Sequence, residues 1–185
     1  MWCRLLLVLC LCGCNDRPAH SVKTANATGN GTNAPKLLTD PPTHLDHAQP
    51  KLRTMKLWLG PKEITAELAI NRIEIGTGMM FRDKMEENEG MLFIFAQPVH
   101  VAFYMKNTQI PLSCAYIDAE GTILEIHDMK PFDETPIEAK SDLVQYVLEM
   151  KQGWFERNNV RIGTVVRTEH GSLAESFFRR RNDNL

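Results

Sequence analysis

Residues 79–112 read MMFRDKMEENEGMLFIFAQPVHVAFYMKNTQIPL, and this stretch decides the fold. It contains two apolar runs, 91–95 and 100–105, each of the length and composition of a buried strand. Arg82 and the triplet 106–108 place charged, amide and hydroxyl groups beside these runs, where a purely structural strand does not need them. We therefore expect the stretch to supply both core strands and the candidate site.

Turn residues divide the rest of the chain into short strands. Gly-Pro-Lys separates 55–59 from 63–69, and Asp-Ala-Glu-Gly separates 114–117 from 122–126, with glycine where a positive φ is needed. The remaining predicted elements are strands at 144–150 and 162–166, one short helix within 71–79 before the breakers Gly76 and Gly78, a single helical turn at 83–86 and a short helix at 153–157. This pattern predicts a mainly β fold: a single antiparallel domain, barrel-like or sandwich-like, with a few short helices.

The amino-terminal residues have the pattern of a bacterial lipoprotein signal. Arg4 precedes the apolar run 5–11, which is too short to form a stable transmembrane helix. The run ends in Leu-Cys-Gly-Cys at 11–14, so small residues precede a thiol that can accept a diacylglycerol. We predict a signal peptide at 1–13 and a palmitate-bearing lipid anchor on Cys14, with an ordinary secretory signal as the alternative. Asn15 in place of Asp favours the outer over the inner membrane.

The composition of residues 14–50 predicts a flexible tether between the lipidated cysteine and the domain. They are rich in Ala, Asn, Thr, Gly and Pro and show no apolar period. The β domain is predicted at 51–170 and a tail at 171–185. With the signal removed and Cys14 lipidated, Cys114 is the one thiol left, so we predict no disulfide and a small buried side chain there.

Charge and motifs exclude several functional classes. The formal net charge of −2 argues against a nucleic-acid partner. Methionine thioethers with His100 or His127 could bind copper(I), and Glu125 with His127 could form half of a zinc site, but neither set is complete. Gly76 and Gly78 lack the strand–helix context of a nucleotide loop, and no nucleophile elbow is present. We predict no metal and no cofactor, assign no catalytic residue, and lean against an enzyme.

Several sequence blocks together resemble the bacterial and archaeal domain-of-unknown-function family 192. They are Gly78–Arg82, Gly90–Phe95, Phe103–Leu112, Tyr116–Asp118, Gly121 and Val147–Gly153. The resemblance spans residues 55–167 and implies a compact, mainly antiparallel β fold, often exported, with no agreed activity. Two positions depart from the family pattern: Tyr104 replaces Trp, and Ser113 replaces the Asp that follows Pro-Leu, which removes a carboxylate.

The polar groups around strand 100–105 form the candidate ligand site. The triplet 106–108 follows the strand directly before a proline-bounded loop, and sites commonly form at such strand ends. In the functional interpretation, Arg82 and Lys106 bind an anionic group and their polar neighbours orient it. The predicted ligand-binding residues are Arg82, Tyr104, Lys106, Asn107, Thr108 and Asp118. In the structural alternative, Asn107 and Thr108 stabilise a loop while Lys106 pairs with Glu89 or Asp118.

We therefore predict a lipid-anchored protein on the periplasmic side of the cell envelope. Its β domain is predicted to bind a small anionic ligand or a partner protein through the Arg82/Lys106/Asn107 region. An envelope enzyme, hydrolase or transferase, using the same pocket is one alternative, and a structural accessory lipoprotein without ligand is another. A polar cleft that converges on Lys106 favours binding or catalysis, whereas a filled, salt-bridged interior favours the structural class.

Overall fold

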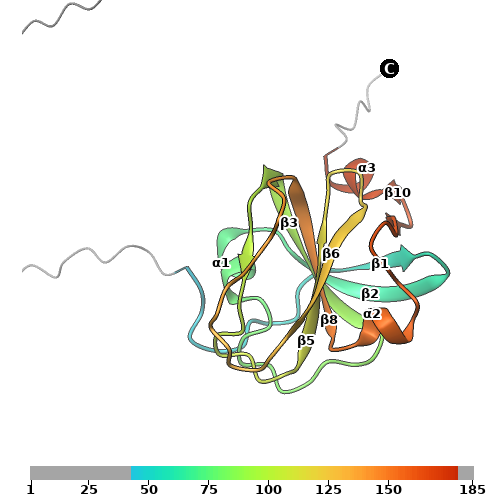
Figure 1. The fold of residues 1–185 in the computed structure, drawn as a ribbon. Helices are drawn as coiled ribbons and strands as arrows, with labels where there is room; N and C mark the ends of the chain where they lie inside the picture. Colours follow the sequence, from blue (N-terminus) through green and yellow to red (C-terminus); the bar gives the residue numbers. More distant parts are fainter. Residues whose placement is uncertain (1–42, 179–185) are drawn as a thin grey trace, which may run out of the picture. The chain divides into compact units, whose positions relative to one another are not determined.

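The computed structural model describes residues 43–178. The predicted signal, Cys14 and most of the tether lie outside these residues, as does the tail from 179 onward. The strands are β1 Thr54–Leu59, β2 Lys62–Ala69, β3 Glu89–Val99, β4 Ala102–Phe103, β5 Leu112–Ile117, β6 Ile123–Met129, β7 Ile137–Glu138, β8 Val144–Lys151, β9 Val166–Thr168 and β10 Gly171–Ser172. The helices are α1 Arg72–Thr77, α2 Trp154–Arg157 and α3 Leu173–Phe177 (Figure 1). No helix in this described range is long and apolar enough to cross a membrane.

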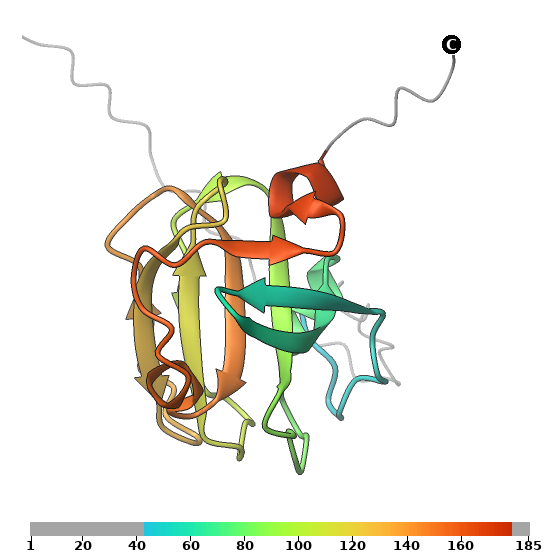
Figure 2. The same ribbon diagram turned by 90° about the vertical axis from the view of Figure 1, so that its right-hand side faces the viewer.

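The mainly β fold is confirmed, and its strands form one large mixed sheet. The order is β10-β9-β1-β2-β3-β8-β5-β6, while β4 and β7 pair separately. Neighbours are antiparallel except β2 and β3, which run parallel because the crossover through α1 returns the chain beside β2 in the same direction. The described part of the sheet does not close into a barrel. Figure 2 shows β1 and β2 lying crosswise to β8 and β5, so the sheet is strongly twisted.

Three predicted elements differ from the structure. The predicted helix at 83–86 is absent, because the Asp83 carboxylate accepts a hydrogen bond from Gln109 Nε2 at 2.7 Å and caps no helix. The predicted strand at 100–105 shortens to β4. The predicted strand at 162–166 lies later, as β9, since Gly163 turns the chain with a φ of 87°.

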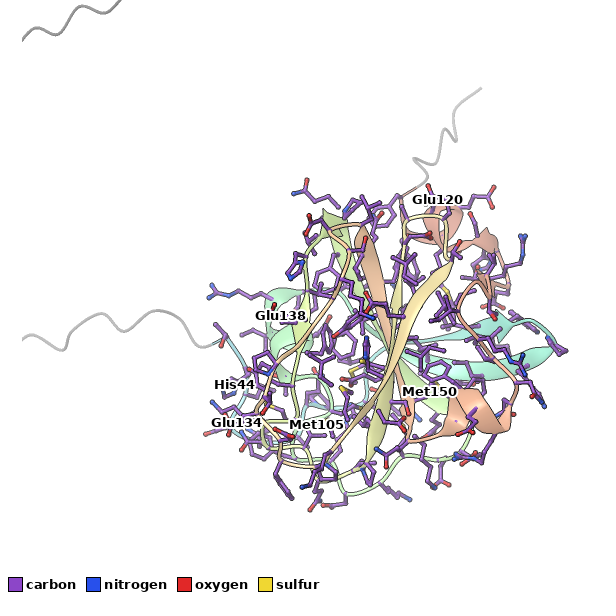
Figure 3. The ribbon with its side chains drawn as sticks, in the orientation of Figure 1. His44, Met105, Glu120, Glu134, Glu138 and Met150 are labelled. Carbon is purple, nitrogen blue, oxygen red and sulfur yellow. The ribbon has the colours of Figure 1, made fainter. Side chains whose placement is uncertain are left out.

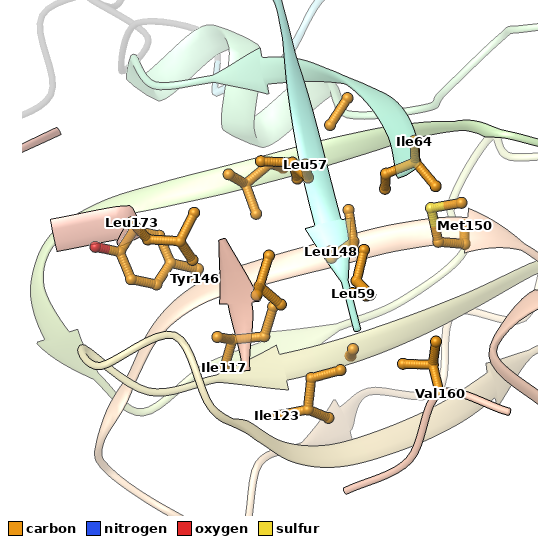
Figure 4. Close-up of a cluster of buried hydrophobic side chains, with 14 of the residues drawn as sticks. Leu57, Leu59, Ile64, Ile117, Ile123, Tyr146, Leu148, Met150, Val160 and Leu173 are labelled. Atoms are coloured by element: carbon orange, nitrogen blue, oxygen red, sulfur yellow. The ribbon is translucent and has the colours of Figure 1, made fainter. Parts of the chain in front are cut away.

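The sheet buries side chains on both faces, so every residue of β5 and every residue of β8 before Lys151 is buried. One face packs around Leu57, Leu148 and Leu173 (Figure 4). Trp154 of α2 belongs to the same cluster. The opposite face carries Met91, Phe93, Cys114, Tyr116 and Val147. Buried Met105 belongs to this second cluster, and its amide donates to the carbonyl of Asp133, the neighbour of exposed Glu134 (Figure 3).

Residues on both sides of the predicted domain, 51–170, contact it in the structure. On the amino-terminal side, the Leu45 amide donates to Thr77 Oγ1 at 3.0 Å and buried Gln49 Nε2 donates to the Gly78 carbonyl at 2.8 Å. Gly76 allows the amino-terminal segment to pack against α1, because a Cβ at position 76 would lie 1.9 Å from the Thr43 carbonyl oxygen. On the carboxyl-terminal side, Ser172 and Glu175 form a capping box at the start of α3, and Leu173 of this helix is buried.

Candidate functional site

A cavity of about 290 Å³ opens on the Met91 face of the sheet. The end of α1, strand β3 and strand β4 surround it, and its walls are apolar: Met79, Met80, Phe93, Phe95 and Phe103. The Phe93 and Phe103 rings meet edge to face with centroids 4.9 Å apart. Gly78, with a φ of 49°, brings the chain close to this pair, since a Cβ there would lie 3.2 Å from the Phe93 ring. The volume suits a ligand of one or two rings, because an apolar cavity of about 150 Å³ holds benzene.

Glu149 is the one carboxylate among the described residues that line this cavity, which we call the Glu149 cavity. It lies on β8 in register with Met91 on β3 and Cys114 on β5. The residue is 4% exposed, and its Oε2 has no hydrogen-bond partner in the described part of the chain. Burial raises the pKa of Glu149 to about 8, so the carboxyl group is mostly protonated at neutral pH.

Arg82 is engaged by a carboxylate of the protein itself. Its guanidinium forms a two-point ion pair with Glu67 on β2, with N–O distances of 2.6 and 2.9 Å. Glu67 Oε2 also accepts the Leu52 amide hydrogen bond at 2.7 Å. Both charged side chains are largely buried, at 16% and 11% exposure. The charge that an anionic ligand would need from Arg82 is therefore already neutralised.

Lys106 has no ion pair within residues 43–178, and neither predicted carboxylate reaches it. Glu89 pairs with Lys51, while Asp118 accepts the backbone amides of Glu120 and Thr122 in the β5–β6 turn. Asp118 thus lies just after the carboxyl-terminal end of β5, whereas the Lys106 loop precedes the amino-terminal end of this strand. Asp118 closes a hairpin and does not join the other predicted site residues.

The other predicted residues divide between loop and cavity. Asn107 has a φ of 54°, and its carbonyl accepts the Phe81 amide at 2.8 Å, so it fixes the path of the loop. Tyr104 and Thr108 line the Glu149 cavity, with Tyr104 41% exposed at its rim. Thr108 is buried, and its hydroxyl donates to the Lys106 carbonyl at 3.0 Å. Two of the six predicted residues therefore border the cavity.

Glu149 is absent from the residues predicted from the sequence, although a signal was present. Every position of β8 before Lys151 is buried, and Glu149 is the one ionisable carboxylate among these buried positions. Carboxylates are almost never fully buried unless they are paired, which makes such a position informative. The sequence instead predicted Arg82 and Lys106 as ligand-binding residues, because these charged residues lie beside the predicted strands of the most distinctive motif.

The remaining polar clusters on this side of the sheet are satisfied internally. His127 Nε2 lies 3.0 Å from Glu125 Oε2, and the other oxygen of Glu125 accepts the Lys140 amide at 2.7 Å. No group of three or more potential metal-ligating side chains occurs in the range the structure describes. Cys114 is a free buried thiol, as predicted, and burial raises its pKa above the usual range.

Ser113 occupies the position at which the family pattern has Asp. Its hydroxyl donates to Asp128 Oδ1 and accepts the Gly153 amide at 2.9 Å. Ser113 and Asp128 are direct register partners on β5 and β6. A carboxylate is thus still present at this end of the sheet, on the facing strand.

Comparison with known proteins places the chain in a family. The model of domain-of-unknown-function family 192, described as an uncharacterized ACR, matches residues 55–168. The chain belongs to this family. No protein of curated function matches it significantly.

Two solved structures are similar to this family 192 chain. A putative transcription regulator from Sinorhizobium meliloti 1021 is 30% identical, with a TM-score of 0.62, and the match covers 65% of this chain and 98% of that one. A protein of unknown function from Novosphingobium aromaticivorans DSM 12444 is also 30% identical, with a TM-score of 0.59, and the match covers 63% of this chain and 86% of that one. Neither description assigns a ligand, so the function rests on the geometry of the site.

Proposed function

We propose that this chain is a lipid-anchored envelope protein whose family 192 domain binds a small molecule with an apolar body in the Glu149 cavity. One observation carries the proposal: a buried carboxyl group with an unpartnered oxygen lines an apolar cavity. Buried polar groups are normally hydrogen-bonded, and leaving one unpaired costs about 1–3 kcal/mol. A ligand that supplies the missing partner removes this cost.

The cavity has more support than an anion site at Arg82. Glu67 neutralises Arg82 within the protein, and neither Arg82 nor Lys106 lines the cavity. Tyr104 and Thr108 belong to both the predicted region and the cavity. The near-balanced charge of the chain also favours a small ligand over nucleic acid.

An enzyme that uses the same pocket is the second candidate, and Glu149 is the reason for keeping it. A carboxyl with a pKa of about 8 can donate or accept a proton near neutral pH, which suits a general acid or base. Cys114 is no nucleophile, because burial holds its thiol protonated. An enzyme would chemically change a molecule that occupies the cavity, whereas a binding protein would release it unchanged.

A neutral aromatic probe tests the cavity. Calorimetric titration with 2-naphthylmethanol should show saturable binding to the purified chain. Ala102 lines the cavity and is exposed, so Ala102→Trp should fill the opening and abolish binding. Ala174, an exposed residue of α3 outside the cavity lining, offers the same change as a control, and Ala174→Trp should bind like the parent. No binding to the parent, or equal binding to both variants, would refute the proposal.

Anchoring is tested at the two cysteines of the signal pattern. Cys14→Ala should abolish lipid attachment and move the protein out of the membrane fraction. Cys12→Ala keeps small residues before Cys14 and should leave attachment intact. Mass spectrometry of the mature amino terminus would overturn this part if Cys14 carries no lipid.

A further inference from the structure

We propose that the Glu149 cavity selects a ligand whose apolar body ends in a protonated amine, and that this ammonium group pairs with the Glu149 carboxylate. The inference rests on the proposed function and specifies the chemistry of its ligand. It depends on three features of the site: the sign of the charge on ionised Glu149, the aromatic walls, and the internal pairing of Glu67 and His127, the charged or titratable groups in the same row of the sheet.

The charge that the cavity offers when Glu149 is ionised is negative. Its described lining includes no lysine or arginine, and Glu149 provides its one carboxylate. The other titratable lining residues are His100 and Tyr104, and His100 Nδ1 lies 3.0 Å from Asp142 Oδ1 at an exposed position. An anionic head group would meet a carboxyl with no cation to balance it. A cationic head group would supply a hydrogen-bond donor and a balancing positive charge to the ionised Glu149 carboxylate.

The aromatic walls favour the same sign of charge. Phe93 and Phe103 form the edge-to-face pair beside Glu149, and Tyr104 stands at the rim. Aromatic faces attract an ammonium group within about 6 Å, and the attraction grows when water is excluded. A carboxylate combined with several aromatic rings is chemistry suited to recognising a cation.

The ionisable groups around Glu149 leave its charge uncompensated. Register pairs form a row across the sheet: Glu67, Met91, Glu149, Cys114 and His127. At about 4.8 Å per strand, Glu67 and His127 lie roughly 10 Å from Glu149, on β2 and β6. Each of the two has its own partner, Arg82 and Glu125 respectively. In the adjacent row Tyr116 donates to the Ile137 carbonyl, and Lys151 is exposed at the end of β8.

Binding of an ammonium group couples to a proton. The carboxyl group is protonated near neutral pH, so it gives its proton to the solvent as the ammonium group enters, and the ion pair forms in its place. The affinity for an amine should therefore rise about tenfold per pH unit below the pKa of Glu149 and level off above it.

Three probes with the same ring system separate the head groups. They are 2-naphthylmethylamine, which is cationic, 2-naphthylmethanol, which is neutral, and 2-naphthylacetate, which is anionic. Each is titrated calorimetrically into the parent chain, Glu149→Gln and Glu138→Gln between pH 6 and 8. Glu138 is the matched control, because it is exposed on β7 and pairs in register with cavity-lining Ala102, so its loss removes the same charge from the nearby surface.

The amine should bind the parent most tightly, and Glu149→Gln should weaken it by about thirtyfold or more, since it removes one member of a desolvated charge pair. The affinities of the alcohol for the parent and for Glu149→Gln should agree within about threefold, and Glu138→Gln should change the affinity of no probe by more than that. Melting temperatures check that each variant is folded. If the alcohol binds but the amine shows no preference, or the acetate binds most tightly, the amine proposal fails while the cavity function stands. If no probe binds, both fail.

Discussion

Glu149 shows how one residue can connect stability with binding. Its carboxyl group lies in the middle of β8 among apolar neighbours, without a hydrogen bond to Oε2 in the described chain. In the unfolded chain the pKa of a glutamate is about 4.5, and in the folded chain that of Glu149 is about 8. Between these two values the unfolded state releases a proton that the folded state retains. Between pH 4.5 and pH 8, Glu149 therefore lowers the free energy of unfolding, and this loss grows as the pH rises.

Replacing this carboxyl by an amide should remove that pH dependence. Each pH unit between 4.5 and 8 lowers the unfolding free energy of the parent by about 1.4 kcal/mol through Glu149. Glu149→Gln should therefore gain stability relative to the parent from pH 5 to pH 8, as measured by urea unfolding at each pH. Glu138→Gln, which alters an exposed carboxylate, should follow the parent. Parallel curves for Glu149→Gln and the parent would contradict the assigned burial.

Another buried carboxylate on this face, that of Glu67, should have the opposite effect on stability. Glu67 is paired with Arg82 through two hydrogen bonds, so Glu67→Gln leaves a largely buried guanidinium without its counter-charge. The expected loss of unfolding free energy is about 3 kcal/mol. Adding Arg82→Met should recover part of it, because the unpaired charge is then gone. A loss below about 1 kcal/mol, typical of an exposed pair, would show that Arg82 is free to serve a ligand.

At the scale of strands, local patterns predicted most of the elements but not how the strands pair. Alternation and turn residues located β1, β2, β5, β6 and β8, because turn chemistry is encoded within a few residues. The parallel pairing of β2 with β3 depends on the path of the crossover between them, which no local pattern encodes. The helix predicted at 83–86 failed for a related reason: Asp83 bonds to a side chain distant in sequence.

The same distinction between local and distant information explains the outcome for the site. Two residues of the motif, Tyr104 and Thr108, line the cavity, as expected for residues at a strand end and in the following loop. The motif could not show that Arg82 meets Glu67, because that contact joins separate strands and loops. Glu149 can be recognised as a candidate site residue only once the fold is known, because β3, β4 and the end of α1 form the cavity that it lines.

The β5–β6 ladder offers a test of how the chain accommodates its departure from the family. Ser113→Asp restores the family residue but sets two carboxylates side by side with Asp128. It should cost at least about 2 kcal/mol of unfolding free energy through charge repulsion in a buried position. The double variant Ser113→Asp/Asp128→Ser exchanges the two groups across the ladder and should recover most of the loss. Equal stabilities of the single and double variants would contradict this pairing.

At the scale of the whole molecule, two residues of the predicted tether, Leu45 and Gln49, hydrogen-bond to the end of α1. A chain that begins at residue 43 keeps the Gln49 and Leu45 hydrogen bonds, whereas one that begins at Lys51 leaves the Gly78 carbonyl and Thr77 without these partners. The shorter chain should melt about 5–10 °C lower, because a lost buried bond of this kind costs about 1–3 kcal/mol. Equal melting temperatures by calorimetry would show that the domain is complete from residue 51.

The central claim is that Glu149 is a buried acid at a site for a small ligand, and carbon NMR of its carboxyl group tests this most directly. The account predicts that the Glu149 carboxyl carbon titrates with a pKa near 8 in the free protein and at a lower pKa when 2-naphthylmethylamine is bound. A free-protein pKa near the ordinary value of 4.5, unchanged by a saturating amount of the amine, would contradict it.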